Sequence, residues 1–205
     1  MSAPVHRTRP RQTPEQTRSQ IVLAMLELLR EQPFREIGVE TVMRRTGHSR
    51  TVFYRHFEDI PSLVLAVITE VGGELVEVGA DWAAVERTSP AEARARLERF
   101  VDFYVRHGPV VRAIAAAAHH DATVDAAYGQ MVEGFIAMTT QAIEARIARG
   151  ELEPLDAPEV ARALVRMLNG YLGDALGQEP FTDRERVLET VWTIWTRTLY
   201  GGASA

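Results

Sequence analysis

The sequence predicts an all-α protein, and two patterns lead to that prediction. Apolar residues recur with the 3.6-residue spacing of amphipathic helices, and no stretch of Val, Ile and Thr alternates with polar residues as in a strand. Helix-start signals, in which a capping residue is followed three positions later by Glu or Gln, occur at Thr13, Ser89, Asp156 and Thr182. The expected fold contains nine helices, which span residues 14–31, 39–46, 50–57, 60–86, 90–107, 109–118, 123–149, 157–177 and 183–200.

Local signals bound the first four expected helices. Thr13 caps the first, and Pro14 suits its first position because the N–H that proline lacks would be unbonded there anyway. Gly47 ends the second helix, Ser49 caps the third, and a turn over residues 58–61 precedes the fourth. No low-complexity linker follows, so the long fourth helix is expected to join the N-terminal part of the chain to the rest.

The last five expected helices are bounded in the same way. Gly108 is interpreted as the stop between the fifth and sixth helices, and the Ala-rich residues 113–118 as a closely packed part of the sixth. Gly150 and Gly177 are expected to end the seventh and eighth, because glycine readily takes the left-handed conformation found just beyond a helix.

Composition is that of a soluble globular protein. Hydrophobic residues make up 46% and charged residues 25% of the chain, and no apolar run reaches the roughly 18 residues of a membrane span. The chain has no Cys, and its polar N-terminal residues lack the apolar core of a signal peptide. We therefore expect a cytoplasmic protein without a membrane partner.

Charge is divided unevenly along the chain. Residues 1–57 contain ten Arg and five Glu, a balance of +5, whereas the remainder contains thirteen Arg against twenty-three Asp and Glu, a balance of −10. A basic segment joined to an acidic one is typical of a protein whose N-terminal part meets phosphates. The alternative is a chance cluster of solvated Arg side chains.

A helix-turn-helix is expected where the second and third helices meet. Val42 and Met43 on the first of these helices are expected to face Phe53 and Phe57 on the second, across a left-handed turn at Gly47. Such packing would leave the other face of the second helix free.

The free face carries the candidates for DNA recognition. Arg50, Thr51 and Arg55 can enter a major groove, and Ser49 caps the helix end whose partial positive charge suits phosphate. A helical hairpin without DNA-binding function would show the same glycine and the same apolar contacts. Spacing alone therefore leaves both interpretations open.

The segment from Ser49 to Phe57 closely resembles the recognition helix of the TetR family of transcriptional regulators, and the resemblance extends over residues 14 to about 70. It implies a dimeric, nine-helix repressor with a three-helix DNA-binding head and a helical body. By this likeness Tyr54 and His56 contact DNA phosphates, while the positions of Arg50 and Thr51 face base edges.

Three residues depart from the family pattern. His48 stands where the family usually has Val or Ile, Met43 where Ala is common, and Ile60 where Lys usually opens the fourth helix. His48 is expected either to support the turn or to contact DNA. The missing Lys puts one phosphate contact in doubt, for which residues 1–12 can compensate as a disordered basic arm along a groove.

The last two expected helices, 157–177 and 183–200, carry wide apolar stripes. Each stripe can face its own core, or two copies can pair these helices into a four-helix interface, as the resemblance implies. A two-fold dimer in turn implies a palindromic operator. The stripe residues are Val160, Ala161, Leu164, Met167, Leu168, Tyr171, Leu172, Ala175, Leu188, Val191, Trp192, Trp195 and Leu199.

Aromatic and Met side chains with a few polar groups mark a candidate pocket in the middle of the chain. Such a lining is typical of sites for apolar ligands, although each aromatic residue can equally be plain core. The candidates on or beside core-facing stripes are Phe100, Phe103, Tyr104, Tyr128, Met131, Phe135, Met138, Thr139 and Asn169.

The C-terminal half more loosely resembles the TetR subgroup of the mycobacterial repressor of the ethionamide-activating monooxygenase, which has a deep, narrow aromatic pocket. The resemblance assigns the lining to Tyr128, Phe135, Met138, Thr139, Asn169 and Trp195. Two pocket aromatics of the subgroup fall on Val101 and Val105 here. The shared features are 135–139, Asn169, 177–180, 193–195 and 199–201.

An enzyme is the main alternative class. It is disfavoured because the chain has no Gly-rich phosphate loop, no Glu-x-x-His pair and no zinc-like spacing of its His residues. His119, His120 and Asp121 form the one local cluster that could hold a metal, and a solvated helix end is the other interpretation. A ligand carrier without DNA-binding function would not explain the polar side chains crowded on residues 50–57.

Together these observations predict a regulator with no cofactor, metal or catalytic site. Residues 1–12 are expected to form the arm, 13–59 the DNA-binding domain, and 60–205 the ligand-binding and dimerisation domain. The expected partners are double-stranded DNA with a palindromic operator, a small apolar effector and a second copy of the chain. The effector would enter among the fourth to eighth helices and move the fourth.

Overall fold

The computed structural model describes residues 13–83 and 89–199, and the part of the chain that it describes contains helices but no strand. The all-α prediction is therefore confirmed. The elements are α1 (Pro14–Glu31), η1 (Phe34–Glu36), α2 (Val39–Thr46), α3 (Arg50–Phe53), α4 (Ile60–Ala83), α5 (Pro90–Ala118), α6 (Ala122–Ala148), α7 (Ala157–Leu176) and α8 (Arg184–Leu199).

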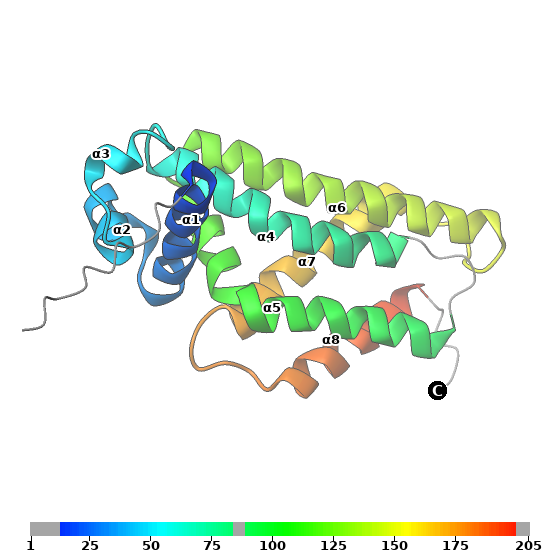
Figure 1. Ribbon diagram of the computed structural model, residues 1–205. Helices are drawn as coiled ribbons and strands as arrows, with labels where there is room; N and C mark the ends of the chain where they lie inside the picture. Colours follow the sequence, from blue (N-terminus) through cyan, green and yellow to red (C-terminus); the bar gives the residue numbers. More distant parts are fainter. Residues whose placement is uncertain (1–12, 84–88, 200–205) are drawn as a thin grey trace, which may run out of the picture.

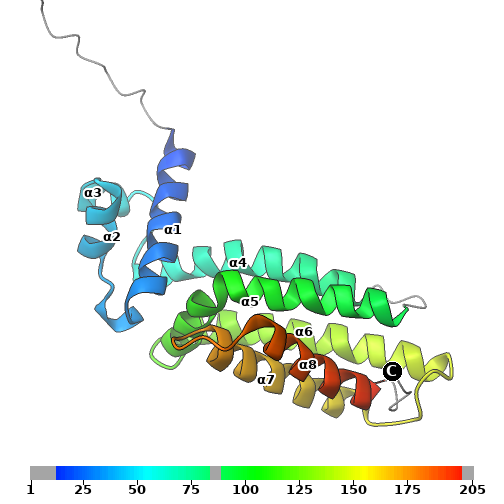
Figure 2. The same cartoon turned by 90° about the horizontal axis from the view of Figure 1, so that it is seen from below.

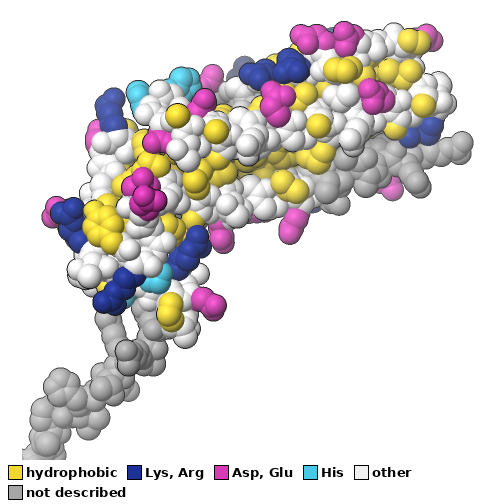
Figure 3. Space-filling view, turned by 90° about the horizontal axis from the view of Figure 1, so that it is seen from above, with side chains coloured by type: hydrophobic (Ala, Val, Ile, Leu, Met, Phe, Trp, Pro, Cys, Tyr) yellow, Lys and Arg dark blue, Asp and Glu magenta, His cyan; other side chains and the backbone are white. Residues whose placement is uncertain are grey.

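The helices divide into a small head and an elongated body. The head contains α1, α2 and α3, while α4 to α8 run away from it as a bundle (Figures 1 and 2). α4 belongs to both parts, because it packs against α1 in the head and against α5 and α6 in the body. Figure 3 shows Arg side chains gathered over the head, as the uneven division of charge suggests. No helix in the described ranges is both long and apolar enough to cross a membrane.

Helix starts largely follow the predicted capping signals. Thr13 and Ser89 each form a capping box, in which the cap side chain and the residue three positions later exchange hydrogen bonds with each other's backbone. Asp156 accepts a hydrogen bond from the backbone N–H of Glu159 at 3.2 Å. At α8 the predicted cap is wrong, because Asp183 rather than Thr182 accepts from a helical N–H.

The fifth and sixth expected helices form one helix, α5, which bends towards its C-terminal end (Figure 1). The predicted stop at Gly108 is therefore wrong. The next residue, Pro109, lies inside α5, and a proline inside a helix bends it without always ending it. A Cβ at Gly108 would overlap the carbonyl oxygen of Leu176 at the end of α7. Gly108 therefore serves the close approach of two helices.

The other predicted stops differ in conformation. Gly47 and Gly150 have φ of 73° and 70°, so both take the predicted left-handed conformation. Gly177 ends α7 but has φ of −97°, so the expected left-handed stop is wrong there. A Cβ at Gly177 would meet the carbonyl oxygen of Gly173, which explains a glycine at this position without a positive φ.

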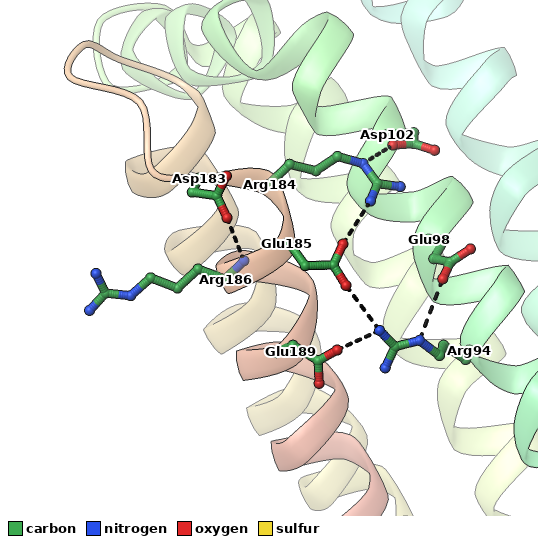
Figure 4. A network of polar contacts seen from close by, with 8 residues as sticks. All are labelled: Arg94, Glu98, Asp102, Asp183, Arg184, Glu185, Arg186 and Glu189. Atoms are coloured by element: carbon green, nitrogen blue, oxygen red, sulfur yellow. Dashed lines mark hydrogen bonds and ion pairs between the residues drawn. The ribbon is translucent and has the colours of Figure 1, made fainter.

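A network of ion pairs joins α5 to α8 on the outside of the body (Figure 4). Arg184 donates from Nε to Asp102 Oδ1 at 2.6 Å, and Arg94 bridges Glu185 and Glu189. The hydrogen bond from Arg94 holds the pKa of the Glu189 carboxyl below its ordinary value. Arg94 also lies 5.9 Å from the ring centroid of Trp192. These contacts fix α8 against the N-terminal half of α5.

Candidate nucleic-acid interface and internal cavity

The apolar contacts and the turn of the helix-turn-helix are as the sequence predicts. Val42, Met43, Phe53 and Phe57 are all buried in the core of the head, and the ring centroids of Phe53 and Phe57 lie 5.7 Å apart. Gly47, with φ of 73° and ψ of 14°, turns the chain between α2 and α3. Burial of these apolar groups fixes the angle between the two helices, so α3 presents its opposite face outward.

The recognition helix is shorter than expected. α3 covers Arg50–Phe53, and the following residues to His56 continue as a turn instead of the predicted helix to residue 57. The backbone N–H of His56 donates to the carbonyl of Phe53 at 2.9 Å, a three-residue step that tightens the turn. The turn buries Phe57 beneath the side chain of Arg18, whose guanidinium lies 5.0 Å from the ring centroid.

Five of the six predicted DNA contacts are exposed. Tyr54 has 54% of its surface exposed, and its ring stands edge-on against buried Phe53 at 5.3 Å. His56 is half-buried. The five exposed residues are Ser49, Arg50, Thr51, Tyr54 and Arg55.

The cations of α3 and of the turn that follows it differ from those of α2 in their partners. Arg44 pairs with Glu40 at 3.3 Å, and Arg45 pairs with Glu27 and Glu31 on α1. In the described ranges, the side chains of Arg50 and Arg55 have no carboxylate partner. Their charges are therefore available to phosphates or base edges.

The predicted contacts lie on two sides of the recognition segment. Arg55 and His56 border a groove that runs between α1 and the helix-turn-helix and is also lined by Gln20. Arg50 and Tyr54 do not line this groove. Arg55 therefore faces the groove, whereas Arg50 and Thr51, which were expected to share its face, do not.

Two residues near the turn have structural contacts. The ring Nε2 of His48 lies 3.3 Å from Oε1 of Gln20, which ties the turn to α1 and favours the structural role for His48. Ser49 is the N-cap residue of α3, but its side chain makes no capping hydrogen bond, so that part of the prediction is wrong. Ile60 is half-buried and packs on the core, which accounts for an apolar residue at the start of α4.

A cavity of about 60 Å³ lies inside the body, between α4, α5, α6, α7 and α8. Ordinary small-molecule sites have roughly 300–1,000 Å³, so a ligand must displace side chains to enter. The Met side chains in the wall allow such displacement, because Met is unbranched and rotates about several bonds. The predicted residues that line the cavity are Phe100, Tyr104, Met131, Phe135, Met138, Thr139, Asn169 and Trp195.

Of the residues that the resemblance assigned to the lining, Tyr128 alone lies outside this wall. It borders a smaller cavity of about 10 Å³, which shares Leu75 and Met131 with the first. Tyr128 still belongs to the same polar chain, since Asn169 Nδ2 donates to its hydroxyl at 2.6 Å and the Tyr104 hydroxyl donates to Asn169 Oδ1 at 2.6 Å. Burial raises the pKa of Tyr104, with the charge of Tyr128 as a second cause, so its hydroxyl stays a donor.

Several wall residues lay outside the sequence prediction. α4 contributes Leu75, Val78 and Gly79, which carry no signal that separates a pocket wall from plain core. Arg96, on α5, could have been found because it stands one turn before Phe100 and so shares its face. The remaining unpredicted residues are Leu97, Val132, Val165 and Leu168. Phe103, Val101 and Val105 are not in the wall; the first two are buried and Val105 is exposed.

Most of the apolar stripe of α7 and α8 is already buried within one protomer. Nine of its residues are core, and Val160, Tyr171 and Trp192 are half-buried. Only Met167, with 38% of its surface exposed, faces solvent. The core interpretation thus holds for the stripe itself, and any dimer contact on α7 must use a neighbouring face.

The cluster at residues 119–121 closes a helix end. His119 Nδ1 lies 2.7 Å from the carbonyl oxygen of Ala115, and Asp121 accepts from the first backbone N–H groups of α6. No group of three His, Asp or Glu side chains in the described part is placed to hold a metal ion.

The C-terminal half of the chain matches a protein-family model. Residues 93–201, more than half of the chain, match the family described as transcriptional regulator EthR, C-terminal domain. The HTH-type transcriptional regulator EthR of Mycobacterium tuberculosis is 29% identical over 190 residues, which cover 88% of this chain and 86% of that protein. EthR of Mycobacterium bovis is similar to the same extent.

Solved structures share the fold. A transcriptional regulator from Rhodococcus sp. Rha1 has a TM-score of 0.74 at 18% identity, and the match covers 95% of this chain and 99% of that one. For GusR of Salmonella enterica the TM-score is 0.72 at 20% identity, over 92% and 97% of the two chains. A regulatory protein of the tetR family from Rhodococcus RHA1 has a TM-score of 0.73 at 14% identity, over 89% and 96%. These relatives are regulators rather than enzymes. With the family match and the shared fold, the chain belongs to the TetR family of transcriptional regulators and has a C-terminal half of the EthR type.

Proposed function

We propose that the protein is a ligand-released repressor that binds a palindromic operator as a dimer in the cytoplasm. One observation carries the proposal: a single helix, α4, packs against α1 in the head and also forms a wall of the internal cavity through Leu75, Val78 and Gly79. A change in the cavity therefore has a direct mechanical route to the head.

The head is proposed to read DNA through residues 13–59, with residues 1–12 as an accessory basic arm. The unpaired side chain of Arg50 enters the major groove with Thr51, while Tyr54, Arg55 and His56 hold the phosphate backbone. The geometry supports this assignment because buried Phe53 anchors α3 beneath these exposed groups.

Residues 60–205 are proposed to bind the effector and to form the dimer through α7 and α8. The exposed face of α7 carries Ala163, Met167, Gly170 and Asp174, spaced by three or four residues along one side. Small residues on this face let two helices approach closely. A two-fold axis there would present two heads to half-sites about 34–36 Å apart.

Effector binding is proposed to favour a second arrangement of α4. Because α4 begins at Ile60, three residues after the buried Phe57, a shift of α4 changes the position of the head relative to the body. The dimer then fits the half-site spacing less well. An effector releases DNA only to the extent that it binds the second arrangement more tightly.

The proposal is tested by selection of binding sites from random duplex DNA. We expect the selected sequences to share an inverted repeat whose half-sites are one helical turn apart or a multiple of it. Binding without a shared sequence would contradict the repressor function, and a single unrepeated half-site would contradict the dimer.

The effector site is tested with Gly79→Ala. A Cβ at Gly79 would lie 2.6 Å from Phe135 Cε1 and 3.3 Å from Met138 Cε, so the ring must move and narrow the cavity. For any apolar compound that releases the protein from its operator, we expect the releasing concentration to rise about tenfold or more, as a loss of about 1.4 kcal/mol requires. Fluorescence anisotropy of labelled operator measures this.

Gly73→Ala is the matched control, since it lies on the same helix with no atom within 4 Å of the new Cβ. It should release DNA as the parent protein does. An unchanged response in Gly79→Ala would place the effector elsewhere, and a parent protein that no apolar compound releases would contradict the sensor function.

A further inference from the structure

Outside the recognition segment, the described part of the head carries two exposed cations that no carboxylate neutralises. These are Arg18 and Arg30, both on α1. Arg44 and Arg45 on α2, in contrast, are paired with Glu side chains. The two cations of α1 differ from each other, because Arg18 has a contact with the recognition segment that Arg30 lacks among the described residues.

The contact of Arg18 is with an aromatic ring. Its guanidinium lies over the ring of Phe57, 5.0 Å from the ring centroid. Phe57 is buried and directly follows residues 54–56, the turn that completes the recognition segment. The ring attracts the cation electrostatically, so the contact fixes where the positive charge stands. Arg18 is thereby fastened to the recognition segment, although it belongs to another helix.

The contact with Phe57 leaves the guanidinium able to bind an anion. A guanidinium has five N–H donors in one plane, and phosphate oxygens accept from donors at the edge of that plane. A ring beneath the guanidinium therefore leaves donors for a second partner. The side chain is also already held in place, so it loses less conformational freedom when an anion binds. Arg18 is in this sense preorganised for a phosphate.

The carboxylates next to Phe57 do not neutralise this charge. Asp59 caps the start of α4, since its Oδ1 accepts from the backbone N–H of Ser62 at 2.8 Å. Glu58 is exposed and, within the described ranges, forms no ion pair with Arg18. The positive charge is therefore available to a partner outside the protomer.

The position of Arg18 favours DNA as that partner. The recognition segment ends at Phe57, and α1 packs beside the start of α4, which follows it (Figures 1 and 2). A DNA strand held at Tyr54 and His56 continues past them with one phosphate per about 3.4 Å of helix axis. We propose that Arg18 contacts a backbone phosphate next to those held by Tyr54 and His56. This inference rests on the proposed function, because it takes the recognition segment as the DNA-binding surface.

The test is the salt dependence of binding to random-sequence duplex DNA, because phosphate contacts do not depend on the bases. Fluorescence anisotropy of the labelled duplex gives the affinity of the full-length protein at several salt concentrations. Arg18→Gln should lower the slope of log affinity against log salt by about 0.9 per protomer, or about 1.8 per dimer. Arg18→Lys should keep the slope, because an ammonium group also neutralises a phosphate.

Arg30→Gln is the matched control. It removes the same charge from an exposed position of the same helix, twelve residues after Arg18, or about 18 Å along α1. The slope of this variant should equal that of the parent protein. Melting temperatures measured without DNA show whether each variant is folded, and exposure of both side chains leads us to expect that all are.

An Arg18→Gln protein with the slope of the parent would overturn the inference. Equal losses in Arg18→Gln and Arg30→Gln would also overturn it, because they would indicate a general effect of net charge. A slope lowered as much by Arg18→Lys as by Arg18→Gln would assign the effect to the ring contact instead of the charge, with the same consequence. None of these results would contradict DNA binding by the head, whereas a parent protein that binds no duplex DNA at low salt would contradict the proposed function itself.

Discussion

Alanine at Arg50 or Tyr54 is expected to weaken operator binding by about 30-fold or more. Arg50 has no carboxylate partner in the described part of the chain and is placed to meet a base edge, and a good base contact is worth about 1–3 kcal/mol. A dimer loses the contact twice, so the loss is about 2–6 kcal/mol. Mobility-shift titrations at constant salt measure the effect.

The two variants should differ in kind. Arg50→Ala should also relax the choice of base at one position of each half-site, whereas Tyr54→Ala should weaken binding to all sequences alike, as expected for a phosphate contact. Arg35→Ala is the control for charge, because it removes an exposed cation of the head outside α3. Since Tyr54 is 54% exposed, melting temperature should barely change. An Arg50→Ala protein that binds as tightly as the parent would remove Arg50 from the recognition surface.

Local signals were sufficient to predict the head. Gly47 needs its positive φ, Val42 and Phe53 need burial, and the reciprocal cap at Thr13 needs only the residue three positions later. Each of these features depends on a few neighbouring residues. Ser49 shows where this reasoning ends: residue type gives its position at the helix start, but the direction of its hydroxyl depends on side chains that the spacing does not specify.

The pocket was predicted where its wall is chemically distinctive. Phe100, Phe135 and Trp195 stand out as large aromatics, and the family likeness selected Asn169. The wall residues of α4 were not predicted, because aliphatic side chains and a glycine such as Gly79 are also what the core of any helical protein contains.

The apolar stripe of α7 and α8 shows a different ambiguity. Burial inside one chain and burial between two chains select the same residue types, so the hydrophobic pattern alone could not separate them. The structure assigns Leu164, Leu168 and Val191 to the core of the protomer. The proposed dimer would therefore use the less apolar neighbouring face, whose small residues a search for hydrophobic spacing passes over.

Gly108→Ala is expected to destabilise the protein by about 2 kcal/mol, within the range of about 1–3 kcal/mol found for overpacked cores. The new Cβ would overlap the carbonyl oxygen of Leu176, lie 2.7 Å from its carbonyl carbon and lie 3.2 Å from the backbone N of Gly177. These are backbone atoms at the end of α7, so relief requires α5 and α7 to move apart. For a chain of this size the melting temperature should fall by about 4–8 °C.

Gly134→Ala should have the opposite sign. Gly134 lies exposed inside α6, and no atom is within 4 Å of a new Cβ. Because alanine has a higher helix propensity than glycine, the substitution should raise the free energy of unfolding by up to about 1 kcal/mol. Thermal and urea unfolding at one protein concentration compare the two variants, which holds any dimer contribution fixed. The same chemical change thus separates two uses of glycine that the sequence cannot distinguish. If Gly108 merely weakened the helix, both variants would be stabilised, and the close crossing of α5 and α7 would not explain why glycine stands at the bend.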